Sequence, residues 1–345
     1  MTCAEPKHGE IEHGDPHETS RVESKPPSAA PAAEREVLGG RYELLGEVDT
    51  GGTAIIYRAR DLTSGAIRAV KVLKPHADAS PVLRSLFLSG ARAAMEIRHP
   101  NVVRILDVQE PSEGIPYAVM ELLEGEPLYR TLDREQQLSP ARAVALMRGV
   151  AQGLAAAHAV DVIHCDMKPE NLFLVNEDGV ERLKIIDFDL AWVPAPKPAD
   201  DGELLRGTAK YMAPEQVLGD PVDARTDVYA VGIVLFRMLT GHLPFDLEVG
   251  TTLLKHHLSS TMPPPSWLVD DLDARLDAIV ERATRKHPEN RYPSMLALLA
   301  DLDAAGSDFE LSQHPVKRQS DRYVPLTARA DERASLLGLV PKKTH

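Results

Sequence analysis

The sequence has little cysteine, no excess of positive charge and no long apolar run. Its two cysteines, Cys3 and Cys165, among 345 residues are too few for a disulfide framework, so we expect a reducing compartment. The formal net charge of -13 argues against a general nucleic-acid binder, because neutralising phosphates needs a basic face. No stretch approaches the roughly eighteen apolar residues of a membrane span, and the first residues lack a signal-peptide pattern. We therefore expect a cytoplasmic protein without a membrane span.

The chain does contain enough apolar residues for a sizeable core. Apolar types make up 43% of it, which favours a globular protein of one large domain or a few small ones. Residues 1–38 are instead rich in Pro, Ala, Ser, Glu and His, and we expect a disordered arm there. His8, His13 and His17 in this arm admit a metal site, but glycine and proline interrupt any shared helical face. A solvated tail is the preferred interpretation.

The remaining pattern places strands first and helices second. Short apolar runs typical of strands occupy residues 41–73 and 102–123, and one alanine-rich helix is expected from Pro81 to Arg98. After residue 125 the spacing of apolar residues predicts helices, the first capped by Ser139. The predicted helices cover residues 139–158, 223–240, 251–258, 272–285 and 293–302. This order predicts an α+β fold with a small antiparallel sheet and a larger, mainly helical part.

A short loop between apolar segments carries three charged or polar side chains. In VIHCDMKPENLFL, residues 162–174, these are Asp166, Lys168 and Asn171. The spacing resembles the catalytic loop of eukaryotic-type (Hanks-type) protein kinases, in which Lys and Asn follow the Asp of His-Arg-Asp by two and five residues. Lys at this position resembles the Ser/Thr-specific branch. The resemblance implies a bilobal kinase fold and that Asp166 accepts the substrate proton, Lys168 stabilises the transferring phosphoryl group and Asn171 binds Mg²⁺.

Two further charged residues stand at family positions. Lys71 in RAVKVL would bind the α and β phosphates of ATP; an ordinary edge-strand lysine is the alternative. Asp187 in IIDFDLA would hold Mg²⁺, where the family has Asp-Phe-Gly. The resemblance also implies that Phe188 packs toward His164 and the long helix. Asp189 replaces the glycine of that motif and removes its freest backbone hinge.

The counter-charge of Lys71 departs from the family. The Glu that normally pairs with this lysine falls on Gly90 here, and Glu96 points elsewhere because it lies about 240 degrees further round the helix. Another group must therefore pair with the lysine. The candidates are Asp187, Asp189, Asp49 and a bound nucleotide.

The loop expected to cover the phosphates is also altered. In LGEVDTGGTAIIYRA, the three family glycines fall on Asp49, Gly51 and Ala54. Gly51 and Gly52 still allow backbone N–H groups to approach phosphates, whereas Asp49 adds a negative charge beside them. A plain hairpin turn is the alternative interpretation of the two glycines.

The adenine pocket follows from the resemblance alone. Met120 would be the gatekeeper, while the Glu121 carbonyl and the Leu123 backbone would bond the base. The side chains expected to sandwich it are those of Val48, Ile56, Ala69 and Phe173. Without the family frame, each of these apolar positions would be interpreted as ordinary core.

Activation by phosphorylation is not expected. Cys165 replaces the family arginine that usually pairs with a phosphate on the activation segment. Residues 190–207 contain no Ser, Thr or Tyr. Since both parts of that switch are missing, we predict that activation-segment phosphorylation does not control this protein.

Later motifs are largely intact. In GTAKYMAPEQ, Thr208 would bond toward the catalytic loop and Met212 would line the pocket for the substrate residue after the phosphoacceptor. Glu215 would pair with Arg291. Asp227 would cap the catalytic-loop backbone from a buried helix. Glu124, Glu126 and Glu170 would rim the substrate groove and suggest basic peptides.

The resemblance covers about residues 41–303. The predicted organisation is an arm at 1–38, a kinase domain at 39–305 with lobes at 39–122 and 126–305, and a tail at 306–345. A helix at 327–339 in the tail could bind a partner, although a frayed tail is the preferred alternative. We predict a Ser/Thr protein kinase that uses ATP and Mg²⁺. A pseudokinase with a binding or scaffolding role is the alternative. A small-molecule phosphotransferase is disfavoured by Lys168 and by the intact protein-docking stretch GTAKYMAPEQ.

Overall fold

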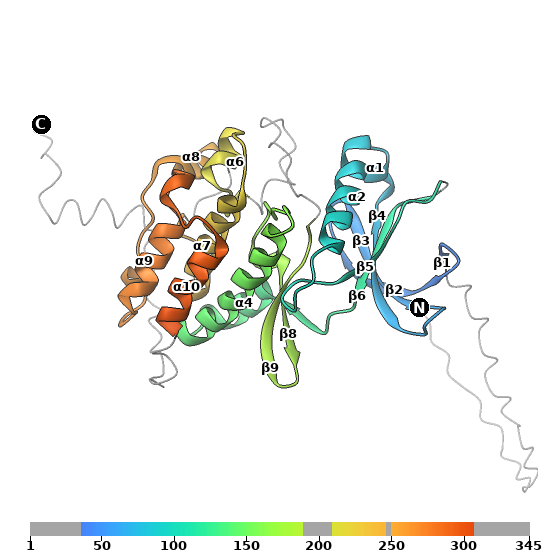
Figure 1. Ribbon diagram of the computed structural model, residues 1–345, viewed down its shortest axis with the longest axis horizontal. Coiled ribbons are helices and arrows are strands. Elements are labelled where there is room, and N and C mark those ends of the chain that lie inside the picture. Colours follow the sequence, from blue (N-terminus) through green and yellow to red (C-terminus); the bar gives the residue numbers. More distant parts are fainter. Residues whose placement is uncertain (1–35, 113, 189–208, 246–249, 307–345) are drawn as a thin grey trace, which may run out of the picture. The chain divides into compact units, whose positions relative to one another are not determined.

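The computed structural model describes residues 36–112, 114–188, 209–245 and 250–306, drawn in colour in Figure 1. Several sequence features lie outside these residues: Cys3, the histidines of the N-terminal arm, Asp189, the segment 190–207, Thr208 and the expected helix at 327–339. Within the described ranges, no helix combines the length and the apolar character that crossing a bilayer requires.

The N-terminal part is an antiparallel sheet of six strands in the order β1-β2-β3-β4-β6-β5. The strands are β1 (Val37–Leu38), β2 (Tyr42–Thr50), β3 (Ala54–Asp61), β4 (Ile67–Leu73), β5 (Ile105–Gln109) and β6 (Tyr117–Glu121). Lys71 pairs with Ile56 of β3 on one side and with Ala118 of β6 on the other. The lysine therefore lies in an interior strand, which argues against the edge-strand interpretation.

One face of this sheet is covered by α2 (Pro81–Met95), which follows the short α1 (Pro75–Asp78). Phe87, Leu88 and Ala91 of α2 pack in one buried cluster with residues of β4 and β6. The helix ends three residues before the predicted Arg98, because the N–H groups of Glu96 and Ile97 bond to carbonyls three residues back. This tighter turn lets Ile97 join the core of the C-terminal part.

A second sheet of three strands begins the C-terminal part. It consists of β7 (Gly125–Pro127), β8 (Leu172–Glu177) and β9 (Val180–Ile185), in that order. Asp178 and Gly179 connect β8 to β9 with φ values of +54° and +82°, the two positive values of a type I′ hairpin turn. Residues 176–179 therefore form the turn of a tight hairpin.

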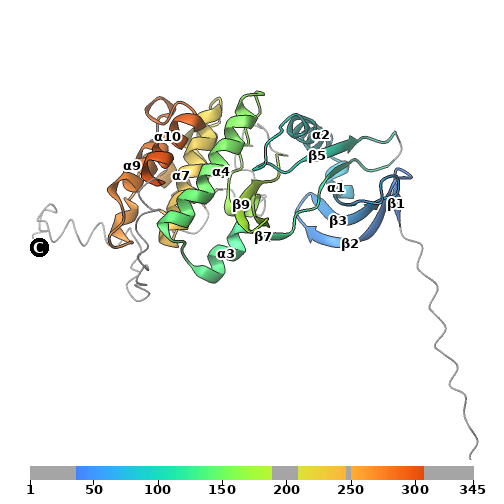
Figure 2. The same cartoon turned by 60° about the horizontal axis from the view of Figure 1, so that its bottom comes forward.

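Helices make up the rest of the C-terminal part. They are α3 (Leu128–Glu135), α4 (Pro140–His158), α6 (Pro214–Leu218), α7 (Ala224–Thr240), α8 (Thr251–Ser259), α9 (Ala274–Ala283) and α10 (Met295–Gly306). Short 3₁₀ turns occur at Pro169–Asn171, Pro265–Trp267 and Pro288–Asn290. Figure 2 shows α4 beside α7, with β9 and α10 also packed against α4.

Two of the helices show how the sequence determines their ends and their positions. The predicted cap of α4 is confirmed, since Ser139 Oγ accepts the Arg142 N–H at 3.3 Å. Nearly every residue of α7 from Thr226 onward is buried. A helix that is apolar all round belongs at the centre of a core, and α7 packs against α4, α9 and α10.

The predicted α+β class is confirmed by this arrangement of one strand-rich and one helical part. The first strand begins at Val37, two residues before the predicted start of the folded domain at 39. The limits at residues 38 and 305 otherwise stay predictions.

Candidate active site

Lys71 and Asp187 bring the two parts of the chain together. The lysine side chain is 8% exposed, and its Nζ contacts Asp187 Oδ1 in both a hydrogen bond and an ion pair. Asp187 follows β9 with a φ of +66°, a backbone conformation that Asp tolerates better than most residues. Among the described residues, Asp187 is therefore the candidate that provides the counter-charge of Lys71.

The charge of Lys71 changes the acidity of Asp187. Crowding by surrounding protein atoms opposes ionisation and raises the pKa of Asp187, but the adjacent Lys71 ammonium more than offsets this. The net result is a pKa below the usual value for Asp. Because 42% of the Asp187 side chain still reaches solvent, this ionised carboxylate is accessible to a cation.

Asp166, Lys168 and Asn171 form one hydrogen-bonded group. Lys168 Nζ lies 2.7 Å from Asp166 Oδ2, and Asn171 Nδ2 donates to the same oxygen at 2.9 Å. The Asn171 amide also donates to the Asp166 carbonyl oxygen at 2.7 Å. Asp166 and Asn171 are both buried. The carboxylate predicted to act as a base is therefore held from two sides.

His164 links this loop to the segment that carries Asp187. The N–H of Asp166 donates to His164 Nδ1 at 3.2 Å, while His164 Nε2 lies 2.9 Å from the Ile186 carbonyl oxygen. A backbone N–H can only donate and a carbonyl can only accept, so the proton of the neutral ring is on Nε2. The ring also packs on Phe188 at a centroid distance of 4.7 Å, which confirms the contact with His164 that the resemblance implied.

Asp227 fixes the backbone of the loop from α7. Its side chain is fully buried and accepts the N–H groups of His164 at 2.9 Å and Cys165 at 2.8 Å. His158 Nε2 lies 2.7 Å from the same carboxylate. This agrees with the role that the resemblance implied for Asp227, because a buried carboxylate requires several donors.

Cys165 occupies the family arginine position with an unusual backbone. Its φ is +62°, and its carbonyl oxygen accepts Gln216 Nε2 at 2.8 Å. Gln216 also caps the start of α6 by accepting the Ala213 N–H at 3.0 Å. The predicted substrate-docking stretch is thus tied directly to the catalytic loop.

The predicted pair of Glu215 and Arg291 is present and deeply buried. Two guanidinium nitrogens of Arg291 each lie 2.7 Å from a Glu215 oxygen, and Arg291 is fully buried. Thr226 donates to Glu215 at 2.8 Å. Met212 is 8% exposed, so nearly all of its surface is covered by other protein atoms.

The loop between β2 and β3 holds the altered glycine motif. Asp49 Oδ1 accepts the N–H of Thr50 at 2.9 Å, which directs this carboxylate toward its own backbone. Lys74 Nζ donates to the Gly51 carbonyl oxygen at 2.5 Å. This lysine, which the sequence analysis did not single out, places a positive charge beside Asp49's loop.

The predicted adenine residues lie on the two sheets and on the chain between them. Ala69 pairs with Met120 across β4 and β6, and Phe173 pairs with Pro127 of β7. Ile56, Glu121, Leu123 and Phe173 are half-buried, Ala69 is buried, and Val48 is 56% exposed. The strands β7 and β8 approach each other closely at Gly125, because a side chain there would collide with the Leu174 carbonyl oxygen.

The residues predicted to bind Mg²⁺ have suitable chemistry. Mg²⁺ prefers oxygen ligands and is commonly held by one or two carboxylates together with substrate phosphates. Asp187 supplies an ionised carboxylate, and Asn171 uses its amide N–H groups on Asp166, which leaves the carbonyl oxygen as a ligand atom. This donor set fits Mg²⁺.

One predicted feature of the substrate groove is weaker than expected. Glu126 is engaged by Arg134 at 2.6 and 3.0 Å and by Thr131 at 2.8 Å. Because its charge is already neutralised locally, Glu126 offers little attraction to a basic peptide. Glu124 and Glu170 are exposed.

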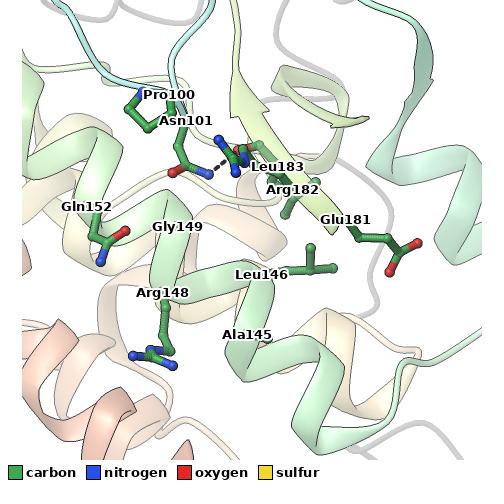
Figure 3. A pocket seen from close by; sticks show the side chains of 10 residues that line it. All are labelled: Pro100, Asn101, Ala145, Leu146, Arg148, Gly149, Gln152, Glu181, Arg182 and Leu183. Atoms are coloured by element: carbon green, nitrogen blue, oxygen red, sulfur yellow. Dashed lines mark hydrogen bonds between the residues drawn. The ribbon is translucent and has the colours of Figure 1, made fainter. Parts of the chain in front are cut away.

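A separate hollow of about 360 Å³ lies between α4 and β9 (Figure 3). Its lining includes Asn101, Leu146, Gly149, Arg182 and Leu183, and the figure shows the Asn101 amide bonded to Leu183. None of the described residues of the predicted site lines this hollow.

Comparison with known proteins identifies the family. The protein kinase domain model matches residues 42–301. The serine/threonine-protein kinase Pkn1 of Myxococcus xanthus is 36% identical over 286 residues, covering 81% of this chain and 41% of that protein. PknL of Mycobacterium tuberculosis is 32% identical over 292 residues, covering 84% of this chain and 72% of that protein.

A solved structure shows the same fold. The crystal structure of the Mycobacterium tuberculosis PknI kinase domain matches with a TM-score of 0.62 and 24% identity, covering 79% of this chain and 98% of that one. This chain spans less than half the length of Pkn1 and of the probable kinase CE0033 of Corynebacterium efficiens, at 41% and 44%. The chain belongs to the eukaryotic-type (Hanks-type) family of bacterial serine/threonine protein kinases.

Proposed function

We propose that this protein transfers the γ phosphate of MgATP to Ser or Thr hydroxyls of protein substrates. The observation that supports this best is one connected set of contacts. Lys71 touches Asp187, His164 joins the segment before Asp187 to the loop, and the loop holds Asp166 against Asn171. Phosphoryl transfer depends on positioned charges more than on covalent chemistry.

Four side chains would have direct roles in the transfer. Lys71 would bind the α and β phosphates, and Asp187 and Asn171 would hold Mg²⁺. When bound, the ion would neutralise charge on the phosphate oxygens. Asp166 would orient the substrate hydroxyl and accept its proton.

Lys168 would stabilise the phosphoryl group during transfer. Its ammonium is 2.7 Å from Asp166, so it would be adjacent to both the hydroxyl and the migrating phosphate. Thr208, outside the described residues, would bond toward this pair. A positive charge at this point stabilises the negative charge that develops on the oxygens of the transferred phosphoryl group.

The base of ATP would lie along the chain between the two sheets. The Glu121 carbonyl and the Leu123 backbone would bond adenine, with Met120 behind it. Val48, Ile56, Ala69 and Phe173 would contact its two faces. Gly51 and Gly52 would cover the phosphates, and Lys74 would offset the charge of Asp49 at that loop.

Control of this activity would not involve phosphorylation of residues 190–207. Their lack of Ser, Thr and Tyr, and Cys165 in place of the family arginine, support this part of the proposal. Mass spectrometry of active and inactive preparations tests it. A phosphate inside this segment that accompanies a gain of activity would refute it.

Transfer of label from γ-labelled ATP to a generic protein substrate tests the proposed function. We expect label in acid hydrolysates on phosphoserine or phosphothreonine. A pseudokinase would bind nucleotide without labelling any protein, and a small-molecule phosphotransferase would label metabolites added in competition. Either result would replace the present proposal.

A further inference from the structure

A buried lysine outside the predicted site joins β9 to the end of β6. The Lys184 side chain is 7% exposed, and a buried ammonium group is costly unless carboxylates partner it. Its Nζ lies 3.0 Å from both oxygens of Glu121 and 3.2 Å from Glu177 Oε1. Two carboxylates from different strands thus meet one ammonium. We call Glu121, Lys184 and Glu177 the hinge clamp.

The carboxylate of Glu121 is held from a third direction. The N–H of Arg104 donates to Glu121 Oε1 at 2.9 Å, and the N–H of Glu121 donates to the Arg104 carbonyl oxygen at 3.0 Å. The Glu121 side chain is 29% exposed. Because several groups share this carboxylate, the last residue of β6 has little freedom to move relative to β9.

The hinge clamp also reaches the other side of the proposed adenine pocket. Lys184 pairs across the sheet with Phe173 of β8. In the proposed function, the Glu121 carbonyl bonds the edge of the base and Phe173 contacts its face. Lys184 therefore contacts Glu121 through its side chain and Phe173 through strand pairing. These are the residues proposed to bind the edge and the face of adenine.

We infer that Lys184 is a positioning residue for the adenine of ATP and acts through Glu121. The inference rests on the proposed function, because it assigns the base to this segment. Hydrogen bonds to a base weaken steeply with distance and angle, so loosening the hinge lowers nucleotide affinity. The groups that act on the γ phosphate are held by other contacts, and the chemical step is unaffected. The variant therefore loses binding energy equally in the ground state and in the transition state. Such a loss raises KM and leaves kcat unchanged.

The test compares KM for ATP and kcat in Lys184→Met, Lys184→Arg and Arg182→Met. Arg182 is the matched control, since it lies 3.5 Å from Glu177 and, in the part of the chain that the structure describes, forms no ion pair with Glu121. We expect Lys184→Met to raise KM about tenfold with kcat within about twofold of wild type. Lys184→Arg should restore KM to within about threefold, and Arg182→Met should leave it unchanged.

Folding is checked by circular dichroism on every variant. If Lys184→Met unfolds because the Glu121 carboxylate loses its counter-charge, the double variant Glu121→Gln, Lys184→Met removes both charges and is expected to show the same tenfold rise. Unchanged KM in a folded Lys184→Met protein, or an equal rise in Arg182→Met, would overturn the inference. Wild-type protein that binds no ATP would instead overturn the proposed function, and the clamp's role with it.

Discussion

Lys71 on β4 contacts Asp187, although 116 residues separate them in the sequence. The helix that covers the sheet, α2, contains no acidic residue. The counter-charge therefore comes from the residue that we assign to Mg²⁺. A bound ion and Lys71 would share this one carboxylate, so nucleotide and metal binding are expected to be strongly linked.

Replacing Lys71 tests this relationship. Lys71→Met removes the charge from the proposed phosphate site and leaves Asp187 without this counter-charge. We expect MgATP affinity to fall at least about tenfold and the rate of transfer to fall about 100- to 1,000-fold. Isothermal titration and initial rates measure these effects. Lys255→Met, an exposed lysine on α8, is the control, and an equal loss in both variants would contradict the assignment.

The buried pair of Glu215 and Arg291 predicts a large loss of stability on truncation. Arg291→Met leaves the Glu215 carboxylate in the core without its bidentate partner. We expect the free energy of unfolding to fall by about 3–5 kcal/mol, measured by urea denaturation. Arg285→Met breaks only an exposed pair with Glu281 and should cost less than about 0.5 kcal/mol. Similar losses for the two variants would show that burial is not the cause.

Asp227 predicts a combined effect on rate and stability. In Asp227→Asn, the amide NH₂ would face a backbone N–H of His164 or Cys165, and two donors cannot bond. We expect a loss of about 1–3 kcal/mol in unfolding free energy and a fall in kcat of at least about tenfold, because the loop that carries Asp166 loses its anchor. The control is Asp223→Asn, which keeps an N-cap acceptor on the same helix. Wild-type kcat in Asp227→Asn would remove the positioning role.

His257 predicts a loss of stability in mild acid. It is fully buried and bonds Tyr229 at 2.9 Å through Nδ1, and burial, aided by Lys286 and His256, lowers its pKa to about 4. The unfolded chain takes up this proton near pH 6.5, whereas the folded chain does so only near pH 4. Stability is therefore full above about pH 6.5 and falls as pH drops toward 4, by at most about 3 kcal/mol.

Urea denaturation between pH 4 and 7 measures this effect. His257→Gln should flatten the dependence, while His76→Gln, which changes an exposed histidine, should leave it as in wild type. An unchanged slope in His257→Gln would show that other groups cause the acid sensitivity.

Local patterns were enough for much of this fold. Ser139 before a proline and the spacing of apolar residues predicted α4. The polar residues at 166, 168 and 171 predicted the catalytic loop, because charged side chains rarely occur between apolar segments without a functional role. The end of α2 was harder to predict, because the tightened turn at Glu96 and Ile97 allows Ile97 to pack against the C-terminal part. That contact has no local signal in the sequence.

Pairings over long distances could not be chosen from the sequence. Four candidates remained for the partner of Lys71, since charge alone does not say which aspartate folds back onto β4. Lys184, between Leu183 and Ile185, carried the same signal as Lys71, a lysine within an apolar strand, and was not recognised. Its partners Glu121 and Glu177 come from separate strands, so only the structure brings the three together.

The most direct test of the central claim is the initial rate of phosphate transfer by wild type and Asp166→Asn at saturating MgATP. Asp166 receives bonds from Lys168 and Asn171, and Asn preserves its size while removing the base. We predict label transfer by wild type, a rate about 100- to 10,000-fold lower in the variant, and equal nucleotide binding in both. Equal transfer by the two proteins would contradict the account.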